Sequence, residues 1–284
     1  MNAFLLISTI TTLTLQNVIM KAYSKRGRGG SFSFASIGAL AALIVFIIAS
    51  GGKLNFNAAI IPHSIAFAVS YCTALVGTFL AVREGPLSLT SLITSYSLIV
   101  PTLYGLIFGG EDISVLLIIG LALLLISLVF INLKSKNDEK KISAKWVFYV
   151  LLAFVGNGMC STVQRIQQEN GCAVYKNEFM IIALLISAVA IFICALLTER
   201  KSTFANLKDA APYAASRGIA NGLTNLFVLL LTPRMPASVM FPLISAGGIV
   251  ATVLISIFVY KEKLSLQEKI GVIIGIAAIV VLNI

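Results

Sequence analysis

Long apolar segments, separated by short charged or turn-forming breaks, fill nearly the whole 284-residue chain. A helix needs about 20 apolar residues to cross the hydrocarbon core of a bilayer, where unpaired backbone polar groups are not tolerated. The pattern therefore predicts an all-α integral membrane protein with ten transmembrane helices. The expected spans are residues 3–20, 33–50, 59–81, 87–108, 114–133, 146–167, 178–198, 210–231, 237–259 and 268–283.

The composition excludes a soluble enzyme. Hydrophobic residues make up 58% of the chain and charged residues 11%, whereas a soluble domain carries about 25% charged residues. The net charge of +10 lies mostly in short loops without aromatic platforms, so we expect the lipid bilayer, and no nucleic acid, as a partner. The four cysteines form no CxxC pair, so neither a disulfide framework, nor a metal site, nor a cofactor is expected.

The second half of the chain repeats a pattern of the first half at a shift of 150 to 151 residues. The matching pairs are Pro86 with Pro236, Ser88 with Ser238, Ser95 with Ser245, and Glu111 with Glu262. Five spans in each half would give the second half the opposite orientation in the membrane. Such inverted repeats are typical of transporters that work by alternating access, and duplication in a passive membrane scaffold is the alternative.

The repeat also predicts the domain organisation. We expect a first five-helix repeat over residues 1–133, a basic inter-repeat loop over 134–145 and a second five-helix repeat over 146–284.

Each repeat contains a helix with an internal proline, then a short loop ending in Glu, a Ser three residues later and a helix bearing Gly. The residues are Pro101, Glu111, Ser114 and Gly120 in the first half and Pro242, Glu262, Ser265 and Gly271 in the second. This pattern resembles the signature of the drug/metabolite transporter (DMT) superfamily, in its ten-helix EamA-like branch. The resemblance implies a small-molecule substrate, since relatives carry amino acids, drugs, nucleotide-sugars or other metabolites.

The leading hypothesis is a secondary transporter, and not an enzyme, that moves a small polar metabolite, such as an amino acid, by alternating access. No carboxylate is expected in the middle of a span, which disfavours carboxylate-coupled proton antiport. A non-transporting membrane receptor or scaffold is the alternative. A membrane enzyme acting on lipid-linked substrates is favoured less, because such chemistry usually needs clustered acids with a metal or several histidines, and the chain has one histidine.

Polar residues inside the spans are the candidate substrate-binding residues. They are Gln16, Asn17, Tyr71, Tyr96, Asn157, Gln164, Gln168, Arg217, Asn221, Asn225 and Ser245. In relatives, helices 1, 3, 4, 6, 8 and 9 line the central cavity, and the resemblance implies the same for the corresponding spans here. The alternative is that these side chains only hydrogen-bond between helices.

Arg217 is expected about two turns into the eighth span, where an ionised side chain is costly unless it faces water or a partner. Its planar guanidinium suits a substrate carboxylate or phosphate. Snorkelling toward the basic loops is an equally weighted alternative. The GxxxG spacing of Gly218 and Gly222 predicts close contact with another helix, within one chain or between two.

The loops that follow the odd-numbered spans hold most of the 21 Lys and Arg residues. Because positive charge in short loops favours the cytoplasm, this bias predicts a multi-pass protein of the cell (plasma) membrane with both termini outside. The oligomeric state is expected to be a monomer or a homodimer.

Overall fold

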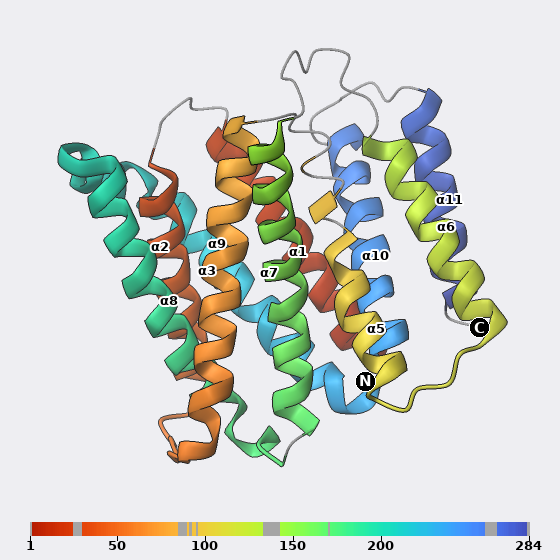
Figure 1. Cartoon of the computed structure of the whole chain (residues 1–284), viewed down its shortest axis with the longest axis horizontal. Helices are drawn as coiled ribbons and strands as arrows, with labels where there is room; N and C mark the ends of the chain where they lie inside the picture. Colours follow the sequence, from red (N-terminus) through yellow and green to blue (C-terminus); the bar gives the residue numbers. More distant parts are fainter. Residues whose placement is uncertain are drawn as a thin grey trace. The chain divides into compact units, whose positions relative to one another are not determined.

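The computed structural model describes residues 2–24, 30–84, 90, 93–94, 96–132, 143–169, 171–258 and 266–282. Within these ranges the chain is all-helical and contains no strand (Figure 1). The helices are α1 (Asn2–Ser24), α2 (Ser31–Ala49), α3 (Ile61–Glu84), α5 (Ile99–Ile107), α6 (Val115–Asn132), α7 (Ala144–Glu169), α8 (Lys176–Glu199), α9 (Thr203–Leu231), α10 (Ala237–Phe258) and α11 (Leu266–Leu282).

Short 3₁₀ helices adjoin several of these α-helices. They are η1 (Ala58–Ile60), η2 (Tyr96–Leu98), η3 (Ala173–Tyr175), η4 (Arg200–Ser202) and η5 (Thr232–Arg234). The turn η4 connects α8 directly to α9. Arg217 lies in the middle of the 29-residue helix α9, which begins at Thr203, before the start of the expected eighth span.

Five helical stretches of the described chain are long and apolar enough to cross a membrane. They are Asn2–Met20, Ser31–Ala49, Ala58–Ala81, Ala144–Glu169 and Ala173–Arg234, and the last contains both α8 and α9. Four shorter apolar helices are Tyr96–Ile107, Val115–Phe130, Ala237–Thr252 and Lys269–Leu282. The number of ten spans stays a prediction, because part of the fourth span and most of the 134–145 loop lie outside the described residues.

The chain forms two compact units, each built from both halves of the sequence. Unit 1 contains Met1–Cys72 and Ile166–Pro233, and unit 2 contains Thr73–Arg165 and Arg234–Ile284. The boundaries fall within α3 and α7, so both helices contribute to both units. The repeat boundaries expected from the sequence stay a prediction.

In unit 1, α2 packs antiparallel to α8, its neighbour in Figure 1. At one end, Glu199 is the last residue of α8. Its carboxylate accepts hydrogen bonds from the backbone nitrogens of Phe32 (2.9 Å) and Ser33 (3.1 Å) at the start of α2. At the other end, Glu178 in the first turn of α8 accepts one from the backbone nitrogen of Asn55, beyond α2. The two helices are therefore tied at both ends.

Helix α2 also packs against α9, and their backbones approach closely. A Cβ atom added to Gly222 would lie 2.9 Å from the Ala42 carbonyl oxygen, and one added to Gly218 would collide with the Gly38 carbonyl oxygen. The close helix contact predicted from the GxxxG spacing is thus confirmed, and it lies within one chain.

In unit 2, α11 packs antiparallel to α6 (Figure 1). A Cβ atom added to Gly120, near the start of α6, would lie 2.6 Å from Cγ of Leu282 at the end of α11. Ser127 Oγ, farther along α6, donates to the Gly271 carbonyl near the start of α11 (2.7 Å). A buried cluster of Leu124, Leu128, Ala246 and Ala278 joins both helices to α10.

Large apolar side chains cover the outer faces of the helices. Among the most exposed are Phe4, Ile48, Val69, Val115, Leu197 and Ile273. Soluble monomers rarely expose apolar surface on this scale, so it is a surface for lipid.

Candidate substrate site

Polar side chains of α1 and α9 form a connected network inside unit 1. Gln16 Oε1 accepts a hydrogen bond from Asn221 Nδ2 (3.1 Å), and Gln16 Nε2 donates to Thr224 Oγ1 (2.8 Å). Gln16 is only 4% exposed, and a buried amide is costly unless its polar atoms are paired. Both ends of this amide are therefore held by α9.

Helical spacing explains how the network extends along each helix. On α9, Asn225 Nδ2 donates to the backbone oxygen of Asn221 (2.8 Å), one turn before it. On α1, Thr12 lies one turn before Gln16, and Thr12 Oγ1 is 2.8 Å from Thr224 Oγ1. Side chains four residues apart share a helix face, so two antiparallel helices bring all five residues together.

The sequence predicted three members of this network, Gln16, Asn221 and Asn225, and missed Thr12 and Thr224. Threonine hydroxyls in helices usually bond to the preceding turn of their own helix, as Thr12 Oγ1 does with the Ser8 carbonyl (2.9 Å). Their presence in a span therefore carries little signal. Their position next to, or one turn from, the predicted amides was the one feature of the sequence that could have identified them.

Arg217 lies one turn before Asn221 on α9. Its guanidinium carbon is 5.9 Å from the ring centroid of Phe34 on α2, a cation–π contact. Its Nε atom is buried and has no hydrogen-bond partner in the part of the chain that the structure describes. The side chain thus combines a charge, partial burial and an unused donor.

Three further predicted residues of unit 1 are Asn17, Tyr71 and Gln168. Asn17 is exposed on α1, and the Tyr71 ring stacks on Phe67 with centroids 6.0 Å apart. Gln168 Nε2 donates to the side-chain oxygen of the neighbouring Gln167 (2.6 Å), which is fully buried. The substrate-binding role of these residues stays a prediction.

The predicted residues Tyr96 and Ser245 of unit 2 line a cavity of about 150 Å³. Leu, Ile and Pro side chains form most of its wall, and the Tyr96 hydroxyl donates to the Leu125 carbonyl (3.1 Å). This lining suits an apolar group rather than a polar solute. Substrate binding by Tyr96 and Ser245 stays a prediction.

The two remaining predicted residues lie on α7, also in unit 2. Gln164 is 3% exposed, whereas Asn157 is exposed and donates to the Ala153 carbonyl of its own helix (2.9 Å). Their substrate-binding role stays a prediction.

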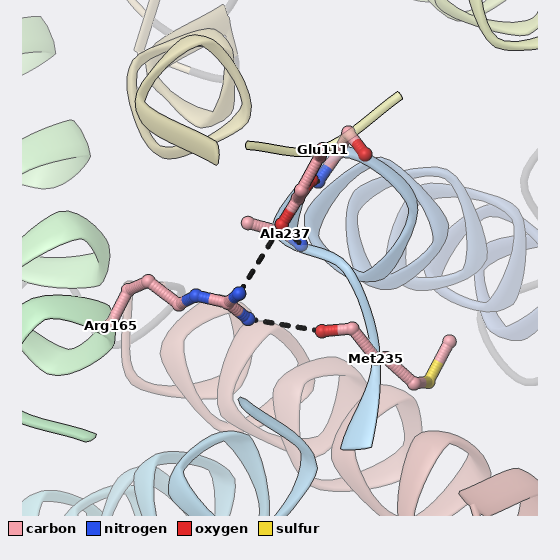
Figure 2. A network of polar contacts seen from close by, with 5 residues as sticks. Glu111, Arg165, Met235 and Ala237 are labelled. Carbon is pink, nitrogen blue, oxygen red and sulfur yellow. Dashed lines mark hydrogen bonds and ion pairs between the residues drawn. The ribbon is translucent and has the colours of Figure 1, made fainter. Parts of the chain in front are cut away.

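Figure 2 shows a second polar network, in unit 2, that the sequence did not predict. Glu111 Oε1 accepts from the Ala237 backbone nitrogen (2.6 Å) and lies 3.3 Å from Arg165 Nη2, while Oε2 accepts from the Ser238 backbone nitrogen (2.8 Å). Arg165 Nη1 donates to the Met235 carbonyl (3.0 Å). Glu111 thus caps the start of α10, where a carboxylate is favoured.

The described residues contain no group of three or more His, Cys, Asp or Glu side chains placed to hold a metal ion. The four cysteines are free thiols.

Comparisons with known proteins connect this fold with a family. Residues 144–284 match the EamA-like transporter family. A solved structure titled only "Crystal structure of protein" has a TM-score of 0.79 to this chain at 14% identity, covering 99% of this chain and 95% of its own, which shows a shared fold. A comparison with curated proteins found no match. The family match, together with the long apolar helices, confirms the resemblance: this chain is a multi-pass membrane protein whose residues 144–284 form an EamA-like transporter family domain, which belongs to the DMT superfamily.

Proposed function

We propose that this protein is a secondary transporter of the plasma membrane that carries a small polar metabolite, an amino acid or similar solute, by alternating access in a fold built from two inverted repeats. The family gives the class of membrane transporter. The choice of a polar solute rests on one observation, the amide network of α1 and α9 within otherwise apolar helices.

Three helix pairs support the inverted repeat. The shift that aligns the halves of the sequence carries α2 onto α8, α5 onto α10 and α6 onto α11, and the same helices pack together as pairs. Each pair is antiparallel. For α5 and α10, the end of one helix lies beside the start of the other. A Cβ atom added to Gly105, near the end of α5, would lie 2.9 Å from Cβ of Ala237 at the start of α10. Antiparallel packing of matching helices is the relation expected of an inverted repeat.

We assign the moving parts of the cycle to the two units, which α3 and α7 connect. Each unit contains helices from both repeats, so the proposed exchange between outward-open and inward-open states is a change between two bodies rather than between two halves of the sequence.

The amides can bind a solute because each carries both donors and acceptors. Gln16 is buried and paired at both ends, so we give it the role of holding Asn221 in place. Asn221 and Asn225 are less buried, and we assign the direct solute contacts to them.

The test is counterflow with the purified full-length protein in liposomes, using radiolabelled amino acids, sugars and nucleosides. We expect accumulation of a polar solute, reduced about 5- to 150-fold by Asn221→Ala, since loss of such a bond costs about 1–3 kcal/mol. Asn55→Ala, at an exposed loop asparagine, is the matched control and retains full rate. Saturable binding without flux would favour the receptor or scaffold, and equal rates for both variants would place the site elsewhere.

We also propose that both termini face the outside of the cell, from the distribution of Lys and Arg. In a chain without its native cysteines, a Lys53→Cys variant should react with a membrane-impermeant maleimide on intact cells, whereas Lys201→Cys should react only after permeabilisation. Both positions are exposed, the first beyond α2 and the second in η4. The reverse pattern would contradict this orientation.

A further inference from the structure

We propose that the transported metabolite carries an oxyanion, a carboxylate or phosphate, that binds to Arg217. This inference rests on the proposed function and deepens it by naming the chemical class of the substrate. It is carried by the state of the Arg217 side chain.

Arg217 lies far from the ends of its helix. It occupies the middle of the 29 residues of α9, and the preceding charged residues of the helix are Lys208 and Asp209. At 1.5 Å per residue, about 12 Å of helix separates Asp209 from Arg217. An ionised side chain within a membrane-spanning helix marks a functional site unless a partner neutralises it.

No such partner is present among the described residues. Arg217 Nε is buried without a hydrogen-bond partner, and no described carboxylate forms an ion pair with the guanidinium. Arginine carries five N–H donors and stays protonated. The Phe34 ring attracts the cation. It offers no oxygen atoms, however, and a guanidinium typically donates hydrogen bonds to a pair of oxygens.

Arg165, an arginine with a structural role in the same protein, provides a comparison. Its guanidinium donates to the Met235 carbonyl and pairs with the Glu111 carboxylate. Among the described residues, Arg217 has neither kind of acceptor. An oxyanion is an acceptor that a guanidinium binds well, and a solute can supply one to a transporter.

The surroundings of Arg217 define the shape of that solute. Phe34, whose ring the guanidinium contacts, lies against Tyr23, with ring centroids 4.5 Å apart. Along α9, Asn221 and Asn225 follow Arg217 at one and two turns, which is about 6 and 12 Å. We infer a metabolite with an oxyanion at one end and hydrogen-bonding groups within that distance of it.

The test is thermal melting of the purified full-length protein in detergent, with probe pairs that differ in one oxyanion group. The pairs are succinate and succinamide, glutamine and glutaminamide, and glycerol 3-phosphate and glycerol, with acetate and inorganic phosphate as the bare groups. A ligand that binds only the folded state raises the melting temperature. We expect the anionic member of at least one pair to raise it and its neutral counterpart not to, and the responding pair distinguishes carboxylate from phosphate.

Two variants show whether the shift depends on Arg217. Arg217→Gln should weaken the effective probe by about 10- to 100-fold, the range for hydrogen bonds to a charged group. Arg234→Gln, at an exposed arginine in η5, is the matched control and should leave the shift unchanged.

Melting without probe separates a binding arginine from a structural one. Arg217→Met removes an unpaired cation and should melt no lower than the wild type, whereas Arg165→Met breaks an ion pair and should melt lower. A similar loss in both variants would overturn the proposal.

The proposal is also overturned if neutral probes stabilise the protein as well as anionic ones, if the shift survives in Arg217→Gln, or if no probe stabilises the wild type. Counterflow of a polar solute by the wild type would still support the proposed transport function in each of these cases. Absence of counterflow with every solute would remove the proposed function itself.

Discussion

The Glu111 carboxylate joins α7 to the start of α10, because its Oε1 atom lies 3.3 Å from Arg165 Nη2 and accepts from the Ala237 backbone nitrogen. The Glu111 side chain is 8% exposed and the Arg165 side chain is 12% exposed. In a buried ion pair, removal of one partner leaves an unpaired charge, which is the costly state.

We expect Glu111→Gln to lower the free energy of unfolding by about 3–5 kcal/mol. The amide keeps one acceptor oxygen but turns an N–H group toward the donors of α10 or Arg165. Thermal melting in detergent measures the loss, and Asp112→Asn, at the exposed neighbouring residue, is the control. Equal melting of the two variants would refute a stabilising role for the pair.

A second prediction concerns Glu199, which accepts from the backbone nitrogens of Phe32 and Ser33 and from Asn206 Nδ2 (2.9 Å). Glu199→Gln should destabilise the start of α2 by about 1–2 kcal/mol, the range for loss of a helix cap. Hydrogen exchange of the first turn of α2 should rise in this variant and stay unchanged in Glu84→Gln, where the glutamate is exposed. Unchanged exchange in both variants would contradict the assignment.

The contact of α2 with α9 gives a third prediction. Gly218→Ala should destabilise the protein, because its Cβ atom would collide with the Gly38 backbone. Gly38→Ala is the matched control, since its Cβ atom would lie 3.6 Å from the Ala214 carbonyl oxygen, an ordinary contact. Melting temperatures of the two variants compare them directly, and a lower value for Gly38→Ala would reverse the prediction.

Thr224→Val tests the amide network without removing an amide. The variant leaves buried Gln16 Nε2 without its acceptor, so we expect a loss of about 1–3 kcal/mol in unfolding free energy and slower counterflow. Thr198→Val, at an exposed threonine whose hydroxyl bonds to its own helix, should change neither quantity. Normal counterflow in Thr224→Val would exclude a role of this hydroxyl in transport.

The sequence predicted helices well where charge or turn residues bound an apolar run. The expected span 114–133 and helix α6, Val115–Asn132, differ by one residue at each end. The start of α9 was missed because its first residues include Asn206, Lys208 and Asp209. Hydropathy marks the part of a helix that lipid can surround, and the helix itself continues into polar sequence as long as its backbone bonds are made.

The candidate site was predictable only in part. Spacing places Asn221 and Asn225 on one face of α9, but it does not tell which helix that face meets. Gln16 joins them through a contact 205 residues away in sequence. The Glu111–Arg165 pair was missed for the same reason: both residues lie at the ends of apolar runs, where most charged side chains are solvated, and only the fold shows that they meet.

The hydrogen bonds of Glu199 to α2 have a consequence for biosynthesis. Phe32 and Glu199 are 167 residues apart in sequence, so α2 leaves the ribosome long before its cap exists. The same holds for Glu111, which is made before the α10 nitrogens that it binds. Neither unit can close while only the first half of the chain has been inserted into the membrane. Assembly of both units therefore waits for the second half.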